Sequence, residues 1–162
     1  MKKKVFLGLG IFCIIAFMLM IALHIVDVRK KEANLVVQQN LNAPIELPAE
    51  EIISYEEAVK IDKPMVIMFY VDWCTYCRKL MPVFGNFAKQ FKNEYSFVAI
   101  NCDKVMYKDL AEKFHVIAYP MLFIYDKKIE HKFSMHVGIM MNNSIMKEEL
   151  EDYLKARKNL VK

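Results

Sequence analysis

The sequence lacks internal repeats and low-complexity segments, and its larger part lacks an excess of charge of either sign. Residues 1–49 carry 6 basic and 3 acidic side chains, whereas residues 50–162 carry 17 and 16, a net charge of +1. So small an excess gives no basic face for a polyanion, and nucleic acid is therefore excluded as a partner. A charged fraction of 26% with 12% aromatic residues also excludes an intrinsically disordered chain.

Charge is also absent from one long apolar segment. Residues 5–26 contain no charged side chain, and 19 of the 22 residues are hydrophobic. A helix of this length reaches about 33 Å, enough to cross a hydrocarbon core of about 30 Å. We therefore expect residues 1–4 to be a basic n-region and residues 5–26 a transmembrane signal anchor in contact with the lipid bilayer. Residues 27–49 then form a tether, and residues 50–162 the folded domain.

A cleaved signal peptide is the alternative for the same segment, because Lys2, Lys3 and Lys4 form a positive n-region. The apolar run is longer than an ordinary signal-peptide core, and no A-x-A-like site follows it, which favours an uncleaved anchor. Basic residues flank both ends, so the orientation depends on the N-terminal amine, which favours an inside N-terminus. This predicts a single-pass protein of a cell (inner) membrane, with its domain in the periplasm or another extracytoplasmic space.

Within residues 50–162, apolar runs alternate with stretches of helical periodicity. The order of these elements is α-β-α-β-α-β-β-α, which predicts an α/β sandwich with a central mixed sheet whose last two strands are antiparallel. Strands are predicted at residues 65–71, 97–101, 121–125 and 129–135. Helices are predicted from a capping box at Ser54, and at residues 74–93, 104–114 and 144–158.

The chemistry is concentrated in Trp73-Cys74-Thr75-Tyr76-Cys77, between a buried strand and a helix. Two cysteines at this spacing at a helix N-terminus are close enough to form a disulfide. The first one faces unpaired backbone N–H groups and the positive end of the helix dipole, which favour its thiolate. Because the thiolate is the nucleophile in disulfide exchange, Cys74 is the candidate attacking sulfur and Cys77 the resolving one.

The cysteine pair has two other possible interpretations, a zinc site and a structural disulfide. A zinc site needs four ligands, and the sequence offers no second C-x-x-C; His131 and His136 could complete a set, but they flank a strand on the far side of the predicted sheet. A purely structural disulfide fits poorly with so short a loop at a helix start. We therefore expect no metal, and we expect Cys102 to be a packed small residue rather than a regulatory thiol.

Nearly all of residues 50–160 resembles the thioredoxin superfamily. The matching features are the buried strand before Asp72-Trp73-Cys74 and the second cysteine, Cys77. Further matches are Pro82, Asp103, Val116 to Pro120, and Val137-Gly138. The Asp72-Trp73-Cys form, followed by Arg78 and Lys79, is most similar to thioredoxin domains that deliver reductant in bacterial envelope systems.

The resemblance implies a thioredoxin-like three-layer sandwich and a redox-active disulfide between Cys74 and Cys77, with no cofactor. It implies that Pro120 is cis and packs beside the sulfurs, and that the Tyr119 backbone pairs with an extended substrate segment. Trp73, Thr75 and Tyr76 support substrate binding. The implied partners are client proteins with cysteines or disulfides and an upstream membrane electron donor.

Two features of the site lead to expectations of their own. Met68 stands where thioredoxins usually carry a buried acid, so we expect resolution by Cys77 to depend on water and to slow near neutral pH. Tyr76 adds no positive charge before the second cysteine, and the ends of Arg78 and Lys79 are expected to be solvated, which favours a reductase or isomerase over an oxidase. A non-catalytic binding module is the remaining alternative, and the intact cysteine pair argues against it.

Overall fold

The computed structural model describes the backbone of residues 2–135 and 142–160, and the side chains of residues 15–35, 43–135 and 142–160. The chain divides into two units, Met1–Asn42 and Ala43–Lys162, and each is described by itself. The first unit is a single helix, α1 (Lys2–Asn42), so residues 27–42 of the predicted tether are helical.

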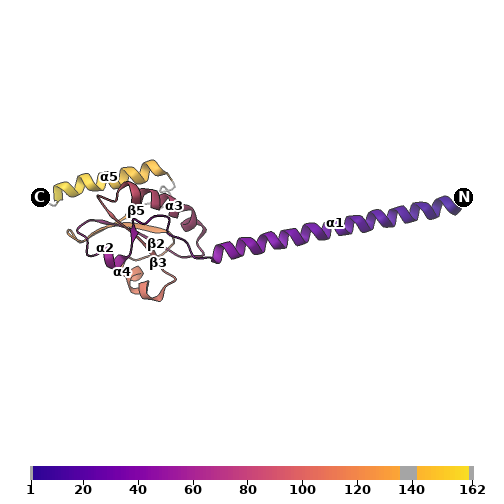
Figure 1. Ribbon diagram of the computed structural model, residues 1–162, viewed down its shortest axis with the longest axis horizontal. Helices are drawn as coiled ribbons and strands as arrows, with labels where there is room; N and C mark the ends of the chain where they lie inside the picture. The colour runs from indigo at the N-terminus through magenta and orange to yellow at the C-terminus, as the bar shows by residue number, and fades with distance from the viewer. Residues whose placement is uncertain (1, 136–141, 161–162) are drawn as a thin grey trace. The chain divides into compact units, whose positions relative to one another are not determined.

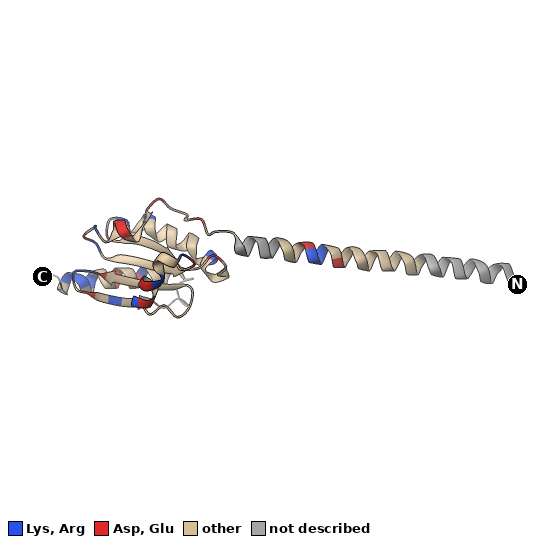
Figure 2. Cartoon of the chain, turned by 90° about the horizontal axis from the view of Figure 1, so that it is seen from below, with Lys and Arg blue, Asp and Glu red and all other residues tan. Residues whose placement is uncertain are grey.

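Charge in the described part of α1 gathers within residues 27–32, whereas residues 15–26 carry none (Figure 2). Among the described residues, no helix has both the length and the hydropathy needed to cross a membrane. The predicted spanning segment, residues 5–26, lies partly outside the described side chains, since those of residues 5–14 are not among them.

The second unit is built on a five-stranded mixed sheet with the strand order β1-β3-β2-β4-β5. The strands are β1 (Ile52–Ile53), β2 (Met65–Tyr70), β3 (Ser96–Asn101), β4 (Met121–Asp126) and β5 (His131–Met135). β1, β3 and β2 are parallel, and β4 and β5 are antiparallel to their neighbours. This confirms the predicted mixed sheet. β1 was not predicted, because two residues are too few to show a period.

Helices cover both faces of the sheet (Figure 1). One face carries α3 (Thr75–Gln90) and α5 (Asn143–Leu160); the other carries α2 (Tyr55–Ala58), the 3-10 turn η1 (Val105–Tyr107) and α4 (Lys108–Lys113). The predicted helix over residues 104–114 is therefore split between η1 and α4. The predicted strand 129–135 begins only at His131, because the turn before it includes Glu130 in a left-handed conformation, with φ 47°.

The packing of β2 on both of its faces explains why its sequence is apolar throughout. Its alternate residues enter two different cores: Val66, Met68 and Tyr70 pack under α3 and α5, whereas Met65, Ile67 and Phe69 pack under α2 and α4. All six residues are buried, as expected for a central strand covered on both faces. This strand leads directly into the cysteine pair, so both cores hold the site in place.

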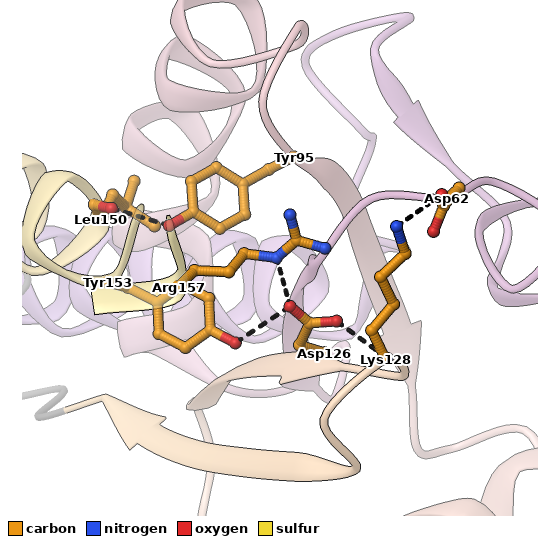
Figure 3. Close-up of polar contacts among 7 residues, drawn as sticks. All are labelled: Asp62, Tyr95, Asp126, Lys128, Leu150, Tyr153 and Arg157. Atoms are coloured by element: carbon orange, nitrogen blue, oxygen red, sulfur yellow. Dashed lines mark hydrogen bonds and ion pairs between the residues drawn. The ribbon is translucent and has the colours of Figure 1, made fainter. Parts of the chain in front are cut away.

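Buried polar contacts fix α5 on the sheet (Figure 3). The Asp126 carboxylate, at the end of β4, accepts hydrogen bonds from Arg157 Nε and from the Tyr153 hydroxyl on α5. The Tyr95 hydroxyl donates to the Leu150 carbonyl at 2.7 Å. Burial raises the pKa of Tyr95, which keeps this donor neutral.

The compact unit begins at Ala43, ahead of the start predicted at Glu50. We call residues 43–49 the strap. Ile45 packs against the core beside α3, and Ala49 is buried. The last residues of the predicted tether are therefore part of the folded unit.

Candidate active site

The cysteine pair lies where β2 gives way to α3. Cys74 is the N-cap residue of α3, and its Sγ accepts a hydrogen bond from the Cys77 backbone N–H at 3.1 Å. The two residues are joined in a disulfide, with 5.2 Å between their Cα atoms. Because the first turn of a helix presents unpaired N–H groups, this position stabilises negative charge on the Cys74 sulfur once the bond is reduced.

The two cysteines differ in their access to solvent. Cys77 is fully buried, whereas Cys74 retains 6% exposure and is bordered by exposed side chains of Thr75 and Tyr76. Trp73, just before the pair, is 59% exposed. Of the two residues, only Cys74 therefore retains contact with solvent.

A carboxylate network holds the loop that precedes Cys74. Asp103 accepts hydrogen bonds from the Asp72 backbone N–H at 2.8 Å and from Trp73 Nε1 at 3.2 Å. Asp72 in turn accepts from Asn101 Nδ2 at 2.8 Å, and Asn101 Oδ1 accepts from the Asp103 N–H. Asp72 and Asp103 are part of the sequence pattern that resembles the thioredoxin superfamily. Their link to Trp73 could not be predicted from that pattern, because it depends on the pairing of β2 with β3.

The Tyr119–Pro120 peptide bond is cis, which confirms the expectation drawn from the resemblance. Pro120 is buried, and the Tyr119 ring meets the Trp73 ring edge-on, with 6.3 Å between centroids. Ile117, in the same loop, is 91% exposed. The loop before β4 thus reaches the loop before α3 through these two aromatic rings.

Cys102 is a free thiol, half-buried after β3. Burial raises its pKa, while a hydrogen bond from the Tyr119 hydroxyl lowers it in part. The pKa of Tyr119 is raised, first by burial and then by Cys102. The expected packing role fits this half-burial, but the contact with Tyr119 was not predicted, because the two residues lie on separate segments.

Arg78 differs from its expected solvated state. It is half-buried, and its guanidinium donates to the Asp72 and Ala43 carbonyls. The reason is the strap, whose carbonyl lies within reach of α3. Lys79 is exposed, with its Nζ 5.9 Å from the centroid of the Tyr76 ring.

The remaining predictions concern metal binding, residues outside the described ranges, and Met68. Across residues 15–35, 43–135 and 142–160, no group of three or more His, Cys, Asp or Glu side chains could hold a metal ion. His136 and Val137-Gly138 lie outside the described residues. Met68, at the position of the usual buried acid, is fully buried.

The site therefore combines a disulfide-bonded cysteine pair at a helix N-terminus with a cis-proline loop. The Thioredoxin family model matches residues 47–155. The chain belongs to the thioredoxin family. The match covers the strap's end, the whole sheet and most of α5.

Thioredoxin-family relatives of known name match parts of this chain. The chloroplastic thioredoxin-like protein HCF164 of Arabidopsis thaliana is 34% identical over 76 residues, which is 47% of this chain and 29% of the relative. Protein disulfide-isomerase 1 of Dictyostelium discoideum is 31% identical over 122 residues, 74% of this chain and 30% of the relative. The matched region is therefore less than a third of either relative.

Solved structures of thioredoxin-family domains share the fold. The Trx4 domain of ERdj5 superposes with a TM-score of 0.54 at 18% identity, covering 67% of this chain and 99% of that domain. The germline-specific thioredoxin Deadhead of Drosophila melanogaster gives 0.51 at 18% identity, covering 60% of this chain and 90% of its own. At these identities the likeness concerns the fold alone.

Proposed function

We propose that this chain is a membrane-anchored thiol:disulfide oxidoreductase that reduces or isomerises disulfides of client proteins on the extracytoplasmic side of a membrane. The observation that carries the proposal is the asymmetry of the pair: Cys74 is the N-cap of α3 with residual exposure, and Cys77 is fully buried one turn later. A nucleophile with residual access to solvent and a second thiol behind it are the parts that dithiol exchange needs.

In the reducing direction, the Cys74 thiolate attacks one sulfur of a client disulfide, and the other client sulfur leaves as a thiolate. The Cys77 thiol loses its proton and attacks the Cys74 sulfur. This forms the Cys74–Cys77 disulfide and releases the second client sulfur. Two electrons pass to the client, and an upstream membrane electron donor returns two electrons to the pair.

Exposed side chains around Cys74 support a protein as the substrate. Trp73 and Tyr76 flank Cys74, and Ile117 lies two residues before Tyr119, whose ring meets that of Trp73; Trp73, Tyr76 and Ile117 are all more than half exposed. Exposed apolar side chains that lie together mark contact surfaces. The backbone at Tyr119, beside the cis-proline, is the segment that we propose to pair with an extended stretch of the client.

Trapping tests the reaction. In the full-length Cys77→Ser variant, resolution is blocked, so mixed disulfides with client proteins should accumulate through Cys74. Cys74→Ser and Cys102→Ser serve as matched controls; the first should trap nothing, and the second should behave like the unaltered chain. Equal capture by Cys77→Ser and Cys74→Ser would refute the exchange mechanism and favour a binding module.

The direction of electron flow is proposed from Tyr76, which brings no positive charge to the position before Cys77. Strong oxidants owe their high potential to an over-stabilised thiolate. We expect the potential of the Cys74–Cys77 pair to lie well below about −120 mV, the value of the oxidant DsbA. A measured potential near that value would make the chain an oxidase.

Anchoring is proposed from the uncharged sequence of residues 5–26. The chain should resist extraction from membranes by alkaline carbonate. In intact cells, after reduction, a membrane-impermeant thiol reagent should label Cys74, identified by its peptide mass. Protection of Cys74 until lysis would exclude an extracytoplasmic domain, and carbonate extraction would exclude the anchor.

A further inference from the structure

The strap lies along α3, the helix that carries the cysteine pair. The Ile45 backbone N–H donates to Asp72 Oδ1 at 2.8 Å, and the Ile45 side chain packs against the core that contains Cys74 and Cys77. A segment that precedes the first strand is therefore bonded to the residue two positions before the attacking cysteine.

Arg78 forms a second link between the strap and the redox loop. It follows Cys77 on α3, and its Nη2 donates both to the Ala43 carbonyl and to the Asp72 carbonyl. One guanidinium thus holds the start of the strap, the loop before Cys74 and α3 together. If the strap leaves, Arg78 loses one of these two carbonyls, and the Asp72 carboxylate loses the Ile45 N–H.

α3 is shaped to receive the strap. A Cβ added at Gly85 would lie 2.4 Å from Pro48 Cγ and 3.2 Å from Pro48 Cβ, so only glycine allows this close approach. Glycine inside a helix costs about 1 kcal/mol relative to alanine. The glycine lies where the strap crosses the helix, and its lack of a Cβ is what permits the contact with Pro48.

Seating the strap affects the charges around the attacking sulfur. The charged and titratable groups around the loop include Arg78 on α3, Asp72 in the loop and Tyr70 before it. Asp103 and Cys102 after β3 and the Tyr119 hydroxyl before Pro120 complete the set. A cation held beside the loop favours a thiolate, and a carboxylate that loses one of its hydrogen-bond donors disfavours it. The strap holds the Arg78 guanidinium at the loop and supplies an N–H to the Asp72 carboxylate, so both effects favour the reduced, thiolate form of Cys74.

We propose that the strap is a positioning element of the redox site, acting through the positioning residues Asp72 and Arg78, and that its seating on α3 sets the equilibrium between the dithiol and the disulfide of Cys74 and Cys77. The inference rests on the function proposed above for the same pair. The reaction in question is the exchange of the Cys74–Cys77 disulfide with two glutathione thiols. It gives two protein thiols and one glutathione disulfide, with two electrons transferred to the protein.

Gly85→Ala unseats the strap without touching the loop, because the new Cβ collides with Pro48. Pro48→Gly in the same chain removes the colliding atoms and should restore the seat. Asn86→Ala is the matched control, since it makes a similar change at an exposed position of α3. Arg78→Gln tests the same link from the other side, and Pro48→Gly alone controls for the loss of proline.

The full-length variants are equilibrated in glutathione buffers, and the Cys74–Cys77 disulfide is quantified by the mass of its alkylated peptide. In Gly85→Ala and Arg78→Gln we expect the equilibrium constant to shift about fivefold toward the disulfide. The pH profile of Cys74 alkylation should move to higher pH. Asn86→Ala should have the same equilibrium constant as the unaltered chain. The double variant Gly85→Ala with Pro48→Gly should have the same constant as Pro48→Gly alone.

The outcomes separate the two proposals. If the unaltered chain forms no reversible Cys74–Cys77 couple, the proposed function fails and this inference with it. If the couple is reversible but Gly85→Ala and Arg78→Gln leave its constant within twofold, only the inference fails, even where their free energy of unfolding has fallen. A shift that Pro48→Gly does not reverse in the Gly85→Ala chain would likewise overturn the role of the strap.

Discussion

Arg157 Nε donates to the carboxylate of Asp126, 31 positions earlier in the chain. The Asp126 side chain is 2% exposed and that of Arg157 is 20% exposed. A carboxylate this deeply buried needs a partner, and this one lies on the helix that closes the fold (Figure 3). The pair therefore connects the docking of α5 to the integrity of β4.

Arg157→Met should lower the free energy of unfolding by about 2 kcal/mol, because it leaves a buried carboxylate without its cation. The loss stays below the full cost of an unpaired charge, since the Lys128 N–H and the Tyr153 hydroxyl still donate to Asp126. Urea denaturation measures the effect. Lys155→Met, which breaks an exposed ion pair on the same helix, should cause no measurable change; equal effects would show that burial of the pair is unimportant.

Much of the fold and of the site could be predicted because it depends on local sequence. The uninterrupted apolar run of β2 indicates a strand covered on both faces, and Cys74 precedes a helical pattern that fixes its place at an N-terminus. The cis bond before Pro120 came from the resemblance. These features need no knowledge of distant partners.

Contacts between distant segments could not be predicted. The pairing of Asp126 with Arg157 joins β4 to α5 over 31 positions of sequence, and no local periodicity encodes such a contact. Arg78 was expected in solvent because nothing in its own neighbourhood places the Ala43 carbonyl beside it. β1 owes its existence to β3, with which its two residues pair.

Asp103→Ala should weaken client recognition more than chemistry. It removes the acceptor of Trp73 Nε1 and of the Asp72 N–H, so the exposed Trp73 ring loses its fixed place. We expect KM for a client protein to rise about threefold, as the loss of one hydrogen bond suggests. The rate with a small disulfide, which does not contact Trp73, should change less than twofold. Asp103→Asn keeps one carbonyl acceptor and should be intermediate; a fall in kcat alone for both substrates would contradict this account.

The reactivity of Cys102 should depend on Tyr119. The thiolate is the reactive form, and burial raises the pKa of Cys102 while the Tyr119 hydroxyl lowers it in part. Tyr119→Phe removes the lowering contribution, so the pKa should rise further and alkylation near pH 8 should slow about threefold. Iodoacetamide rates are measured against pH.

This measurement requires a chain in which Cys13, Cys74 and Cys77 are serine, so that Cys102 is its one thiol. Tyr76→Phe, which removes an exposed hydroxyl, should leave the Cys102 profile unchanged. A Cys102 profile that moves to lower pH in Tyr119→Phe would show that the hydroxyl does not donate to the sulfur.

Met68 offers a test of how the second half of the exchange proceeds. It is fully buried in the same core cluster as Cys77, and its thioether cannot accept the proton that Cys77 must lose before it attacks. Resolution in the unaltered chain should therefore depend on thiolate formed through water, and its rate should rise about tenfold per pH unit below the pKa of Cys77. Met68→Asp places a carboxyl group there whose own pKa is raised by burial, so that it can take up a proton near neutrality. We expect a flatter pH profile of the resolution rate and a faster rate at pH 7, measured by the resolution of a model mixed disulfide at Cys74.

Met68→Leu keeps the site apolar and should follow the unaltered chain, because the rate depends on a proton acceptor at position 68 rather than on the shape of the side chain. Identical profiles for Met68→Asp and Met68→Leu would mean that the proton of Cys77 leaves by a route that does not pass position 68.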